Sequence, residues 1–546
     1  METRASSIRP APSTAAERAV FAREALALIP KILTLQDRNA HSPTYGCFDR
    51  NYWHYKIIDF PSGMAAEFVW PLALVYSLDL PNNPYYQQPA LRQWIEAGIR
   101  YAARSAHPDG SCDDYFPFEK AAGAAAFSLL ACLEAYTLLE MHDGEMLEFF
   151  ARRADWLANH HESGRLTNHQ ALIVLCLEKA GSLLDTERWD ELKAKRLARV
   201  LEWQNEEGWF QEYEGADPGY HTLTVGLLAQ VHELTPSHEL REAIERAVKF
   251  AAEFIHPDGS FGGEYTSRNT YNFFPHGFEI AGRWLPEALT INDQFVAGLS
   301  RGLGACYADD HILGHHGWSY LLAWKHWVGS RPPVPPRPTG RVYFKNAGLL
   351  IDRRDNCELY LALNKGGVFK LWRDGKLVAS DTQFSVQVEK GKKVRTAVAH
   401  LVGRSDVKLD GHTINIRGKL GWAKSKRMST FNLVVLRFLM FTVGRFFPDL
   451  IRKLLQKMLI TGKKAAPFRF HRKLTWGDGR LHTSDELRSK KGWGAARTVG
   501  IGAAQTSIYV VMSRTYQSGQ LQPWLDLTEQ MHQLKDDEVL KVERSL

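Results

Sequence analysis

A short turn sequence recurs through the first 330 residues and limits what that part of the chain can fold into. It reads His-Pro-Asp-Gly-Ser at 107–111 and again at 256–260. Looser versions lie at 161–165, 205–209 and 310–314. The copies are about 50 residues apart, which is enough for one helical hairpin between successive turns. Because stacked hairpins bury a shared core, we predict an incomplete (α/α) toroid over residues 1–330.

A proline-rich segment, residues 331–338, separates two kinds of sequence. Proline cannot continue a helix and favours an extended chain. Before this segment apolar residues recur with a helical period, as at 120–141, and after it apolar and polar residues alternate, as at 357–363. The sequence therefore predicts a multidomain α + β protein in which residues 331–338 link the toroid to an antiparallel β-sandwich-like domain over 339–546.

Charge is divided unevenly between these two parts. Residues 331–546 contain 40 Lys and Arg against 18 Asp and Glu, whereas residues 1–330 contain 28 and 43. A strongly basic domain attracts polyanions such as acidic glycans or anionic lipids. No nucleic-acid reader motif is present, so we expect no nucleic-acid partner. The N-terminus has no apolar stretch typical of a secretory signal, and the six cysteines form no CxxC pair, so a cytoplasmic protein with reduced core thiols is expected.

Polar and aromatic residues gather where the inner helices of the repeat are predicted to begin. The groups are Glu119, Asn168 with His169, Tyr220 with His221, Arg268 with Asn269, and His315 and His316 with Trp318. Turns that recur in phase place these helix starts on one rim, where free N–H groups suit a carboxylate or sulfate. Each group alone could instead cap a helix or form a salt bridge, as Arg268 could with Glu264 or Glu279.

The order and spacing of several motifs resemble the heparinase II/III-like polysaccharide lyases. The motifs are Gly46–Trp53, Asp109-Gly-Ser with Phe118-Glu119, Thr167-Asn-His169, Gly219-Tyr-His221, and Ser267–Thr270 with Pro275–Glu279. The resemblance implies cleavage of a uronate-containing acidic polysaccharide by β-elimination. It also implies that Asn168 and His169 bind the uronate carboxylate, that Tyr220 transfers the proton, and that His221 assists Tyr220.

The other rim residues are predicted to bind substrate. They are Glu119, Arg268, Asn269, His276, His315, His316 and Trp318. The β domain of such lyases commonly brings a histidine-rich loop to the cleft, and in some members it binds a metal. The corresponding stretches here, 363–370 and 379–383, contain no histidine, and the nearest are His400 and His412. We therefore expect no metal site and no cofactor, and the second proton-transfer group stays unassigned.

Two other functions remain open on the sequence alone. A non-catalytic glycan-binding factor in capsule or exopolysaccharide production would keep the cleft without a complete acid and base set. A terpene cyclase would also use helical barrels with aromatic linings, but the chain has no Asp-x-Asp-Asp motif.

An apolar and basic segment departs from the pattern of a secreted lyase. Residues 432–447 carry only Arg437 and Arg445 as charges, and after Pro448 the segment resumes with interleaved Lys and Arg. It is too short and broken to span a bilayer, which takes about 20 apolar residues. We expect an amphipathic helical insertion at about 430–462 that contacts an anionic membrane through 432–464, on the inner face of the cytoplasmic membrane. Packing of these helices on the β domain is the alternative.

Overall fold

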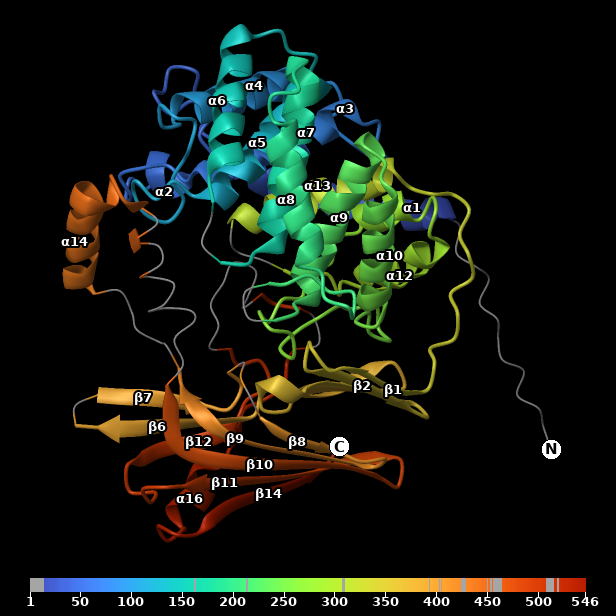
Figure 1. Cartoon of the computed structure of the whole chain (residues 1–546), viewed down its shortest axis with the longest axis vertical. Coiled ribbons are helices and arrows are strands. Elements are labelled where there is room, and N and C mark those ends of the chain that lie inside the picture. The colour runs from blue at the N-terminus through green and yellow to red at the C-terminus, as the bar shows by residue number, and fades with distance from the viewer. Residues whose placement is uncertain are drawn as a thin grey trace.

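The computed structural model describes residues 14–546 apart from short internal stretches. The stretches outside the description are 162–163, 213–214, 307–309, 392, 402, 404, 424–428, 449, 452–453, 455–463, 507–514 and 518–519. A helical domain lies on one side of two antiparallel sheets, and one helix, α14 (Thr430–Leu439), stands beside the helical domain (Figure 1). Among the described residues, no helix combines the length and apolar character that crossing a membrane would take.

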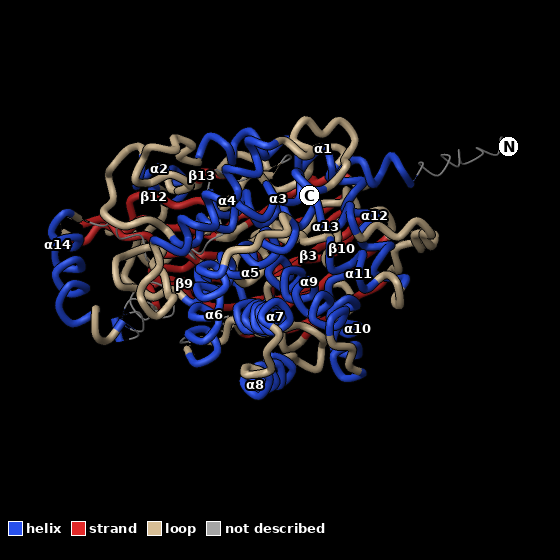
Figure 2. Tube along the Cα trace, turned by 90° about the horizontal axis from the view of Figure 1, so that it is seen from above, coloured by secondary structure: helices blue, strands red, loops and turns tan. Residues whose placement is uncertain are grey.

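The helical domain consists of inner helices that are apolar all round and outer helices that are amphipathic. The inner helices are α3 (Val69–Ser77), α5 (Ala122–Leu138), α7 (Thr167–Leu184), α9 (Pro218–Leu234), α11 (His276–Ala281) and α13 (Asp310–Lys325). The outer helices are α4 (Pro89–Arg104), α6 (Gly144–Asn159), α8 (Asp190–Glu202), α10 (His238–Ala252) and α12 (Pro286–Leu299). A helix that is hydrophobic on every side must be surrounded by protein, so the two sets form two layers (Figure 2).

The first and last helices of this domain meet. Helix α13 packs against both α1 (Thr14–Leu35) and α3, and α12 packs against α1. Short helices α2 (Arg50–Trp53) and η1 (Gly63–Phe68) connect α1 to α3. The predicted toroid of helical hairpins is therefore confirmed.

The recurring turns have one shared geometry. In each of the turns at 107–111, 205–209 and 256–260, the first N–H donates to the last carbonyl and the glycine N–H donates to the first carbonyl. Their glycines have φ values of +85° at Gly110, +95° at Gly208 and +78° at Gly259. A Cβ on any of them would collide with the backbone of an outer helix, so only glycine fits there. The fifth predicted turn, 310–314, was wrong, because Asp310 begins α13.

A five-stranded antiparallel sheet, counted over the described residues, lies directly against the toroid. Its strands are β1 (Gly340–Phe344), β2 (Leu349–Arg354), β3 (Cys357–Ala362), β4 (Val368–Arg373) and β5 (Lys376–Asp381). Successive side chains of a strand point to opposite faces. Ile351, Tyr360 and Trp372 belong to the core of the toroid, whereas Leu350, Leu361 and Leu371 belong to the core of the second sheet. The middle strands are therefore buried on both faces.

The second sheet contains nine strands within the described part of the chain, in the order β13-β12-β6-β7-β9-β10-β11-β14 with β8 beside β9. Its strands are β6 (Phe384–Lys390), β7 (Lys393–Val398), β8 (Asp406–Leu409), β9 (Thr413–Trp422), β10 (Ala465–Gly477), β11 (Arg480–Ser489), β12 (Ala496–Ile501), β13 (Leu525–Asp526) and β14 (Val539–Ser545). The short helix α16 (Thr528–His532) follows β13. Together the two sheets confirm the predicted antiparallel β-sandwich-like domain.

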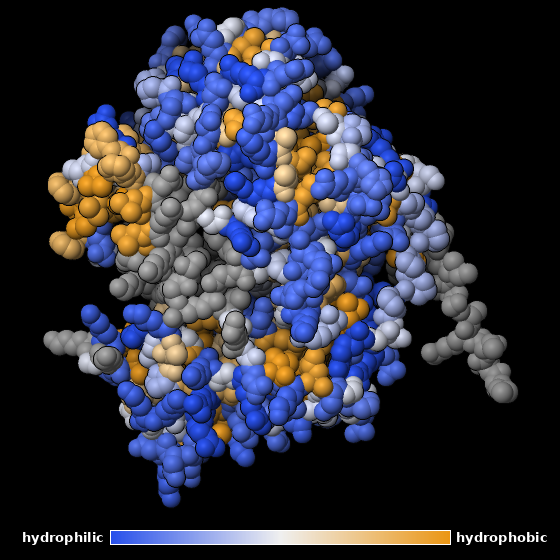
Figure 3. All heavy atoms as spheres, viewed as in Figure 1, coloured by the Kyte–Doolittle hydropathy of each residue, from blue (hydrophilic) through white to orange (hydrophobic). Residues whose placement is uncertain are grey.

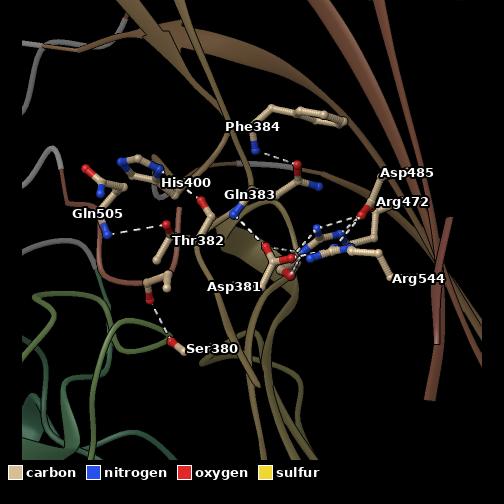
Figure 4. Close-up of polar contacts among 12 residues, drawn as sticks. Ser380, Asp381, Thr382, Gln383, Phe384, His400, Arg472, Asp485, Gln505 and Arg544 are labelled. Carbon is tan, nitrogen blue, oxygen red and sulfur yellow. Dashed lines mark hydrogen bonds and ion pairs between the residues drawn. The ribbon is translucent and has the colours of Figure 1, made fainter. Parts of the chain in front are cut away.

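A buried charge network joins the two sheets (Figure 4). Arg472 on β10 contacts Asp381 at the end of β5 at 2.9 Å and Asp485 on β11 at 2.6 Å. Arg544 on β14 contacts the same two carboxylates at 2.6 and 2.8 Å. Although burial raises it, the two guanidinium groups hold the pKa of Asp381 below its ordinary value. The charges balance, so this pairing fixes how β5 sits on the second sheet.

Ion pairs and a hydrogen bond hold the proline-rich segment against the toroid where it passes from one domain to the other. The helices before it end at Lys325 and the strands after it begin at Gly340. Arg331 pairs with Glu279 at 2.7 Å and with Asp293 at 2.6 Å. Arg337 donates to the carbonyl of Ile255 in the toroid at 2.7 Å. The linker is thus bound to the toroid at both ends.

The predicted insertion is a helix, α14 (Thr430–Leu439), followed by a single π-helical turn, Met440–Gly444. Most of its predicted second half lies outside the described residues. One other sequence expectation needs correction: five cysteines are buried, but Cys306 is exposed and is not a core thiol.

Candidate active site

Three of the predicted site residues lie together with Glu212 where helices α7 and α9 begin. The Asn168 amide donates to both carboxylate oxygens of Glu212 at 2.8 Å, and its backbone N–H donates to the same carboxylate at 3.0 Å. Arg268 donates to Glu212 at 2.9 Å. The guanidinium carbon of Arg268 lies 3.8 Å from the centre of the Tyr220 ring. Asn168, Glu212, Arg268 and Tyr220 are hereafter the Tyr220 cluster.

One buried aspartate holds this cluster in place. Asp217 precedes α9, caps it by accepting the N–H of Tyr220 at 3.1 Å, and also accepts the N–H of Arg268 at 3.0 Å. It accepts hydrogen bonds from the hydroxyls of Thr266 and Thr270 as well. Because Tyr220 and Arg268 are both fixed to Asp217, the start of α9 and the loop before α11 keep one relative position.

The carboxyl group of Glu212 accepts the hydrogen bonds that hold the cluster together. Burial raises the pKa of Glu212, although Arg268 and Asn168 oppose the rise. The side-chain oxygen of Asn168 is buried without a hydrogen-bond partner among the described residues.

Two further predicted residues lie near this rim. His169 is half-buried, and its ring fills the space beside Gly123 of α5 and meets Phe127 edge-on at 6.5 Å. Glu119 does not begin a helix, because α5 starts at Ala122. Its carboxylate accepts the N–H groups of Asp114 and Tyr115 at 3.3 and 2.8 Å. Glu119 therefore holds a turn in addition to any contact with substrate.

The β domain contributes a lysine that sequence reasoning missed. Lys365, which is 1% exposed, donates to the carbonyls of Glu264 and Thr266 at 2.7 and 2.8 Å and to the side-chain oxygen of Asn269. Burial lowers the pKa of Lys365 to about 7, against the opposing charges of Asp217 and Glu264. The three acceptors match the three donors of an ammonium group. Lys365 thus fastens the loop that carries Arg268 to the β domain.

We expect Lys365→Met to lower the free energy of unfolding by about 3 kcal/mol, because three buried acceptors would lose their donor. Chemical denaturation measures this change. Lys345→Met, at an exposed position of the same domain, is the matched control and should stay within about 0.5 kcal/mol of the parent. Equal changes in the two variants would contradict the role assigned to Lys365.

Two predicted site histidines lie away from the cluster, inside the helical core. His221 accepts the N–H of Phe210 at 3.4 Å through Nδ1, and its Nε2 contacts the carbonyl of Ala247 at 2.8 Å. Burial lowers its pKa to about 4. His276 contacts Ser319 and Gln230, and burial lowers its pKa to about 3. Both rings are occupied in helix packing, so these contacts support neither the role expected for His221 in assisting Tyr220 nor the substrate contact expected for His276.

The predicted group on α13 is also separate from the cluster. His315, His316 and Trp318 lie within the helix and not at its start. Glu67 accepts from His315 at 2.6 Å and from the Trp318 indole at 2.5 Å, and Trp318 stacks on Trp70 with ring centres 4.6 Å apart. These contacts join α13 to the beginning of the toroid. His316 stacks on Phe274 and lines a pocket of about 190 Å³ between α1 and α13.

Arg268 and Asn269 were predicted at a helix start but lie in the loop before α11. The salt-bridge partner of Arg268 is Glu212, and neither Glu264 nor Glu279, which pair with Lys370 and Arg331. Asn269 contacts Thr506 of the β domain in addition to Lys365. Within the described residues, no group of three or more His, Cys, Asp or Glu side chains could hold a metal ion.

The architecture, a toroid of helical hairpins followed by antiparallel sheets, is similar to that of a solved polysaccharide lyase. A xanthan lyase from Paenibacillus matches 98% of this chain with a TM-score of 0.51 at 9% identity, and this chain spans 57% of that lyase. The chondroitin AC lyase of Streptomyces coelicolor A3, in complex with chondroitin sulphate, has a TM-score of 0.49 at 12% identity, with 100% and 80% of the chains covered.

The heparan sulfate lyase HepC from Pedobacter heparinus has a TM-score of 0.42 at 12% identity, with coverages of 92% and 72%. No protein-family model and no curated protein matches the sequence. At such identities the similarity shows the fold, and function must be argued from the site.

Proposed function

We propose that this chain is a polysaccharide lyase that cleaves a uronate-containing acidic glycan by β-elimination. The observation that carries the proposal is the Tyr220 cluster, in which a tyrosine ring lies against a guanidinium group beside a buried amide. Three of its members, Asn168, Tyr220 and Arg268, come from the motifs that resemble the heparinase II/III-like lyases. The cluster lies where a β-domain lysine meets the toroid, so a glycan chain could be held between the two domains.

The chemistry needs a carboxylate whose negative charge is neutralised. Arg268 and the Asn168 amide would bind the uronate carboxylate, which makes the proton on the adjacent ring carbon more acidic. A neutral Glu212 would avoid repulsion between two carboxylates. His169 follows Asn168 on the same helix and would bind the same sugar.

Tyr220 would carry the proton. Its deprotonated oxygen takes the proton from the ring carbon beside the carboxylate, and the electron pair of that C–H bond forms a carbon–carbon double bond. The bond to the glycosidic oxygen breaks, and this oxygen leaves with the proton that Tyr220 has acquired. The positive charge of Arg268 against the ring favours negative charge on the Tyr220 oxygen.

A panel assay tests the proposal. The purified full chain is incubated with glucuronan, alginate, heparan and hyaluronan, and the unsaturated uronate product is followed by its ultraviolet absorbance. We expect a signal on at least one polymer, and a loss of about a hundredfold or more in Asn168→Ala, because the carboxylate would lose a donor.

A second candidate is a glycan-binding factor without turnover. It is favoured by the positions of His221 and Lys365, since the first is packed in the core and the second is fully engaged by the toroid loop. Binding of a uronate polymer to the folded protein, with no unsaturated product from any polymer, would support this candidate and reject the lyase.

A further inference from the structure

Helix α14 exposes a continuous line of large apolar side chains. Phe431, Val434 and Phe438 are 75%, 60% and 67% exposed, and Phe446 and Phe447 after the π-helical turn are 73% and 62% exposed. The resulting apolar patch stands out at the side of the molecule (Figure 3). We call these five residues the α14 ridge. An apolar patch of this kind on a folded protein marks a surface that another apolar phase covers.

The ridge has a fixed direction because the other side of the segment is attached to the toroid. Arg437 pairs with Asp59 at 3.0 Å, and Phe441 meets Phe118 with ring centres 5.3 Å apart. Met440 is fully buried. With 3.6 residues per turn, Met440 lies roughly opposite Phe431 and Phe438, whereas Arg437 lies to one side of them. The apolar side therefore points away from the body of the protein.

Charge identifies the chemistry of the partner. From Thr413 to Gly477 the sequence contains fifteen Lys and Arg and one acidic residue, Asp449. An apolar ridge carried on so basic a segment suits an anionic lipid surface, because cations meet the headgroups while aromatic side chains enter the acyl boundary. A neutral, apolar protein surface would offer no acidic groups to these basic side chains.

The strands that carry α14 add an independent sign of an anionic ligand. Arg469 on β10 lies directly opposite Lys419 on β9 and Arg488 on β11. Like charges opposite each other destabilise a sheet unless an anion lies between them. These three cations line a surface pocket of about 420 Å³. Lys419 also lines the adjoining pocket, of about 560 Å³, together with Trp422 and Ala465, the residues at which the chain leaves and rejoins the sheet.

We propose that the α14 ridge docks this protein onto an anionic lipid bilayer, with its phenylalanines in the acyl boundary and the neighbouring cations at the headgroups. The helix lies on the membrane surface and does not cross it. This inference goes beyond the lyase chemistry and does not depend on it, since the Tyr220 cluster and the ridge share no residue.

Co-flotation of the full chain with vesicles tests the proposal. Vesicles of phosphatidylcholine alone are compared with vesicles that also contain phosphatidylglycerol. We expect binding to the anionic vesicles, weaker binding to the neutral ones, and a decline as salt is raised, because screening weakens attraction between cations and headgroups. Phe438→Gln with Phe446→Gln should lower binding by about tenfold or more.

A matched control and a second measurement make the result decisive. Leu521→Gln changes a side chain that is 83% exposed outside the ridge, and its binding should equal that of the parent. Lyase activity on soluble polymer should be the same in the parent and the ridge variant. The proposal is overturned if the ridge variant floats like the parent. It is also overturned if the parent binds no vesicle and sedimentation shows that the parent is a dimer whereas the ridge variant is a monomer. The ridge would then join two copies of the chain.

Discussion

Tyr220→Phe is expected to lower the turnover rate of elimination by about a thousandfold while leaving the Michaelis constant within a small factor of the parent value. The substitution removes only the oxygen that would accept and return the proton, and general acid–base groups contribute roughly 10²–10⁴-fold to rate. The ring would still pack against Arg268, so binding of the uronate carboxylate should survive. Initial rates of ultraviolet absorbance over a range of polymer concentrations separate the two constants.

The matched control for this substitution is Tyr320→Phe. Tyr320 on α13 is 5% exposed, as Tyr220 is, but it lies outside the cluster. Both variants should unfold at nearly the same denaturant concentration as the parent. If Tyr220→Phe retains most of the turnover, another group transfers the proton and the assignment of Tyr220 fails. If both variants lose turnover together, the loss reflects packing and not chemistry.

Acidification is expected to unfold the protein well before its carboxylates are fully protonated. Burial lowers the pKa of His221 to about 4 and the pKa of His276, His316 and His400 to about 3, from an ordinary value of 6.5. The unfolded chain therefore binds more protons than the folded chain below pH 6.5. Stability is complete above that pH and falls as pH drops toward the folded values.

The size of this effect follows from the number of histidines. Well below pH 6.5 each contributes a loss of about 1.4 kcal/mol per pH unit, and less near pH 6.5, where the histidine of the unfolded chain is only half protonated. The four together lower the free energy of unfolding by about 6 kcal/mol between roughly pH 6.5 and pH 5, which is comparable to the whole stability of many proteins. Denaturant titrations at several pH values measure the slope.

Single substitutions identify the source of the slope. His276→Gln should lower the difference in bound protons between the unfolded and the folded chain by about one in this range, because a glutamine amide binds no proton. His238→Gln is the control, because it makes the same substitution at an exposed position on α10. A parent protein whose stability is flat from about pH 7 to pH 5 would contradict the neutral, buried state of these histidines.

The sequence was sufficient to predict the two layers of helices and the antiparallel sheets, because hydrophobic period and turn glycines report local structure directly. The site was harder to predict for a physical reason. The inner helices are buried on every side. Their hydrophobic pattern therefore does not show whether a polar side chain on them lines a cleft or pairs with another group in the core. His276 and Trp318 looked like rim residues, yet Ser319 and Glu67 occupy their polar atoms.

Long-range pairing explains the remaining errors. Glu212 lies far from Asn168 and Arg268 in sequence, in a stretch without a motif, so nothing local predicted that one carboxylate would contact both. Lys365 lies in the stretch in which a catalytic histidine was expected, and the glycines that follow it predicted only a turn. The feature that could have identified Lys365 is a cationic side chain in a turn that lies against another domain.

The five-stranded sheet has a consequence for how the chain can be divided. One of its faces completes the core of the toroid and the other completes the core of the second sheet. A fragment ending at the prolines would expose the helical surface that covers Tyr360 and Trp372, and a fragment beginning there would expose those rings. The chain should therefore melt as one cooperative unit, and a gene cut at residue 330 should yield two aggregation-prone products and no functional half.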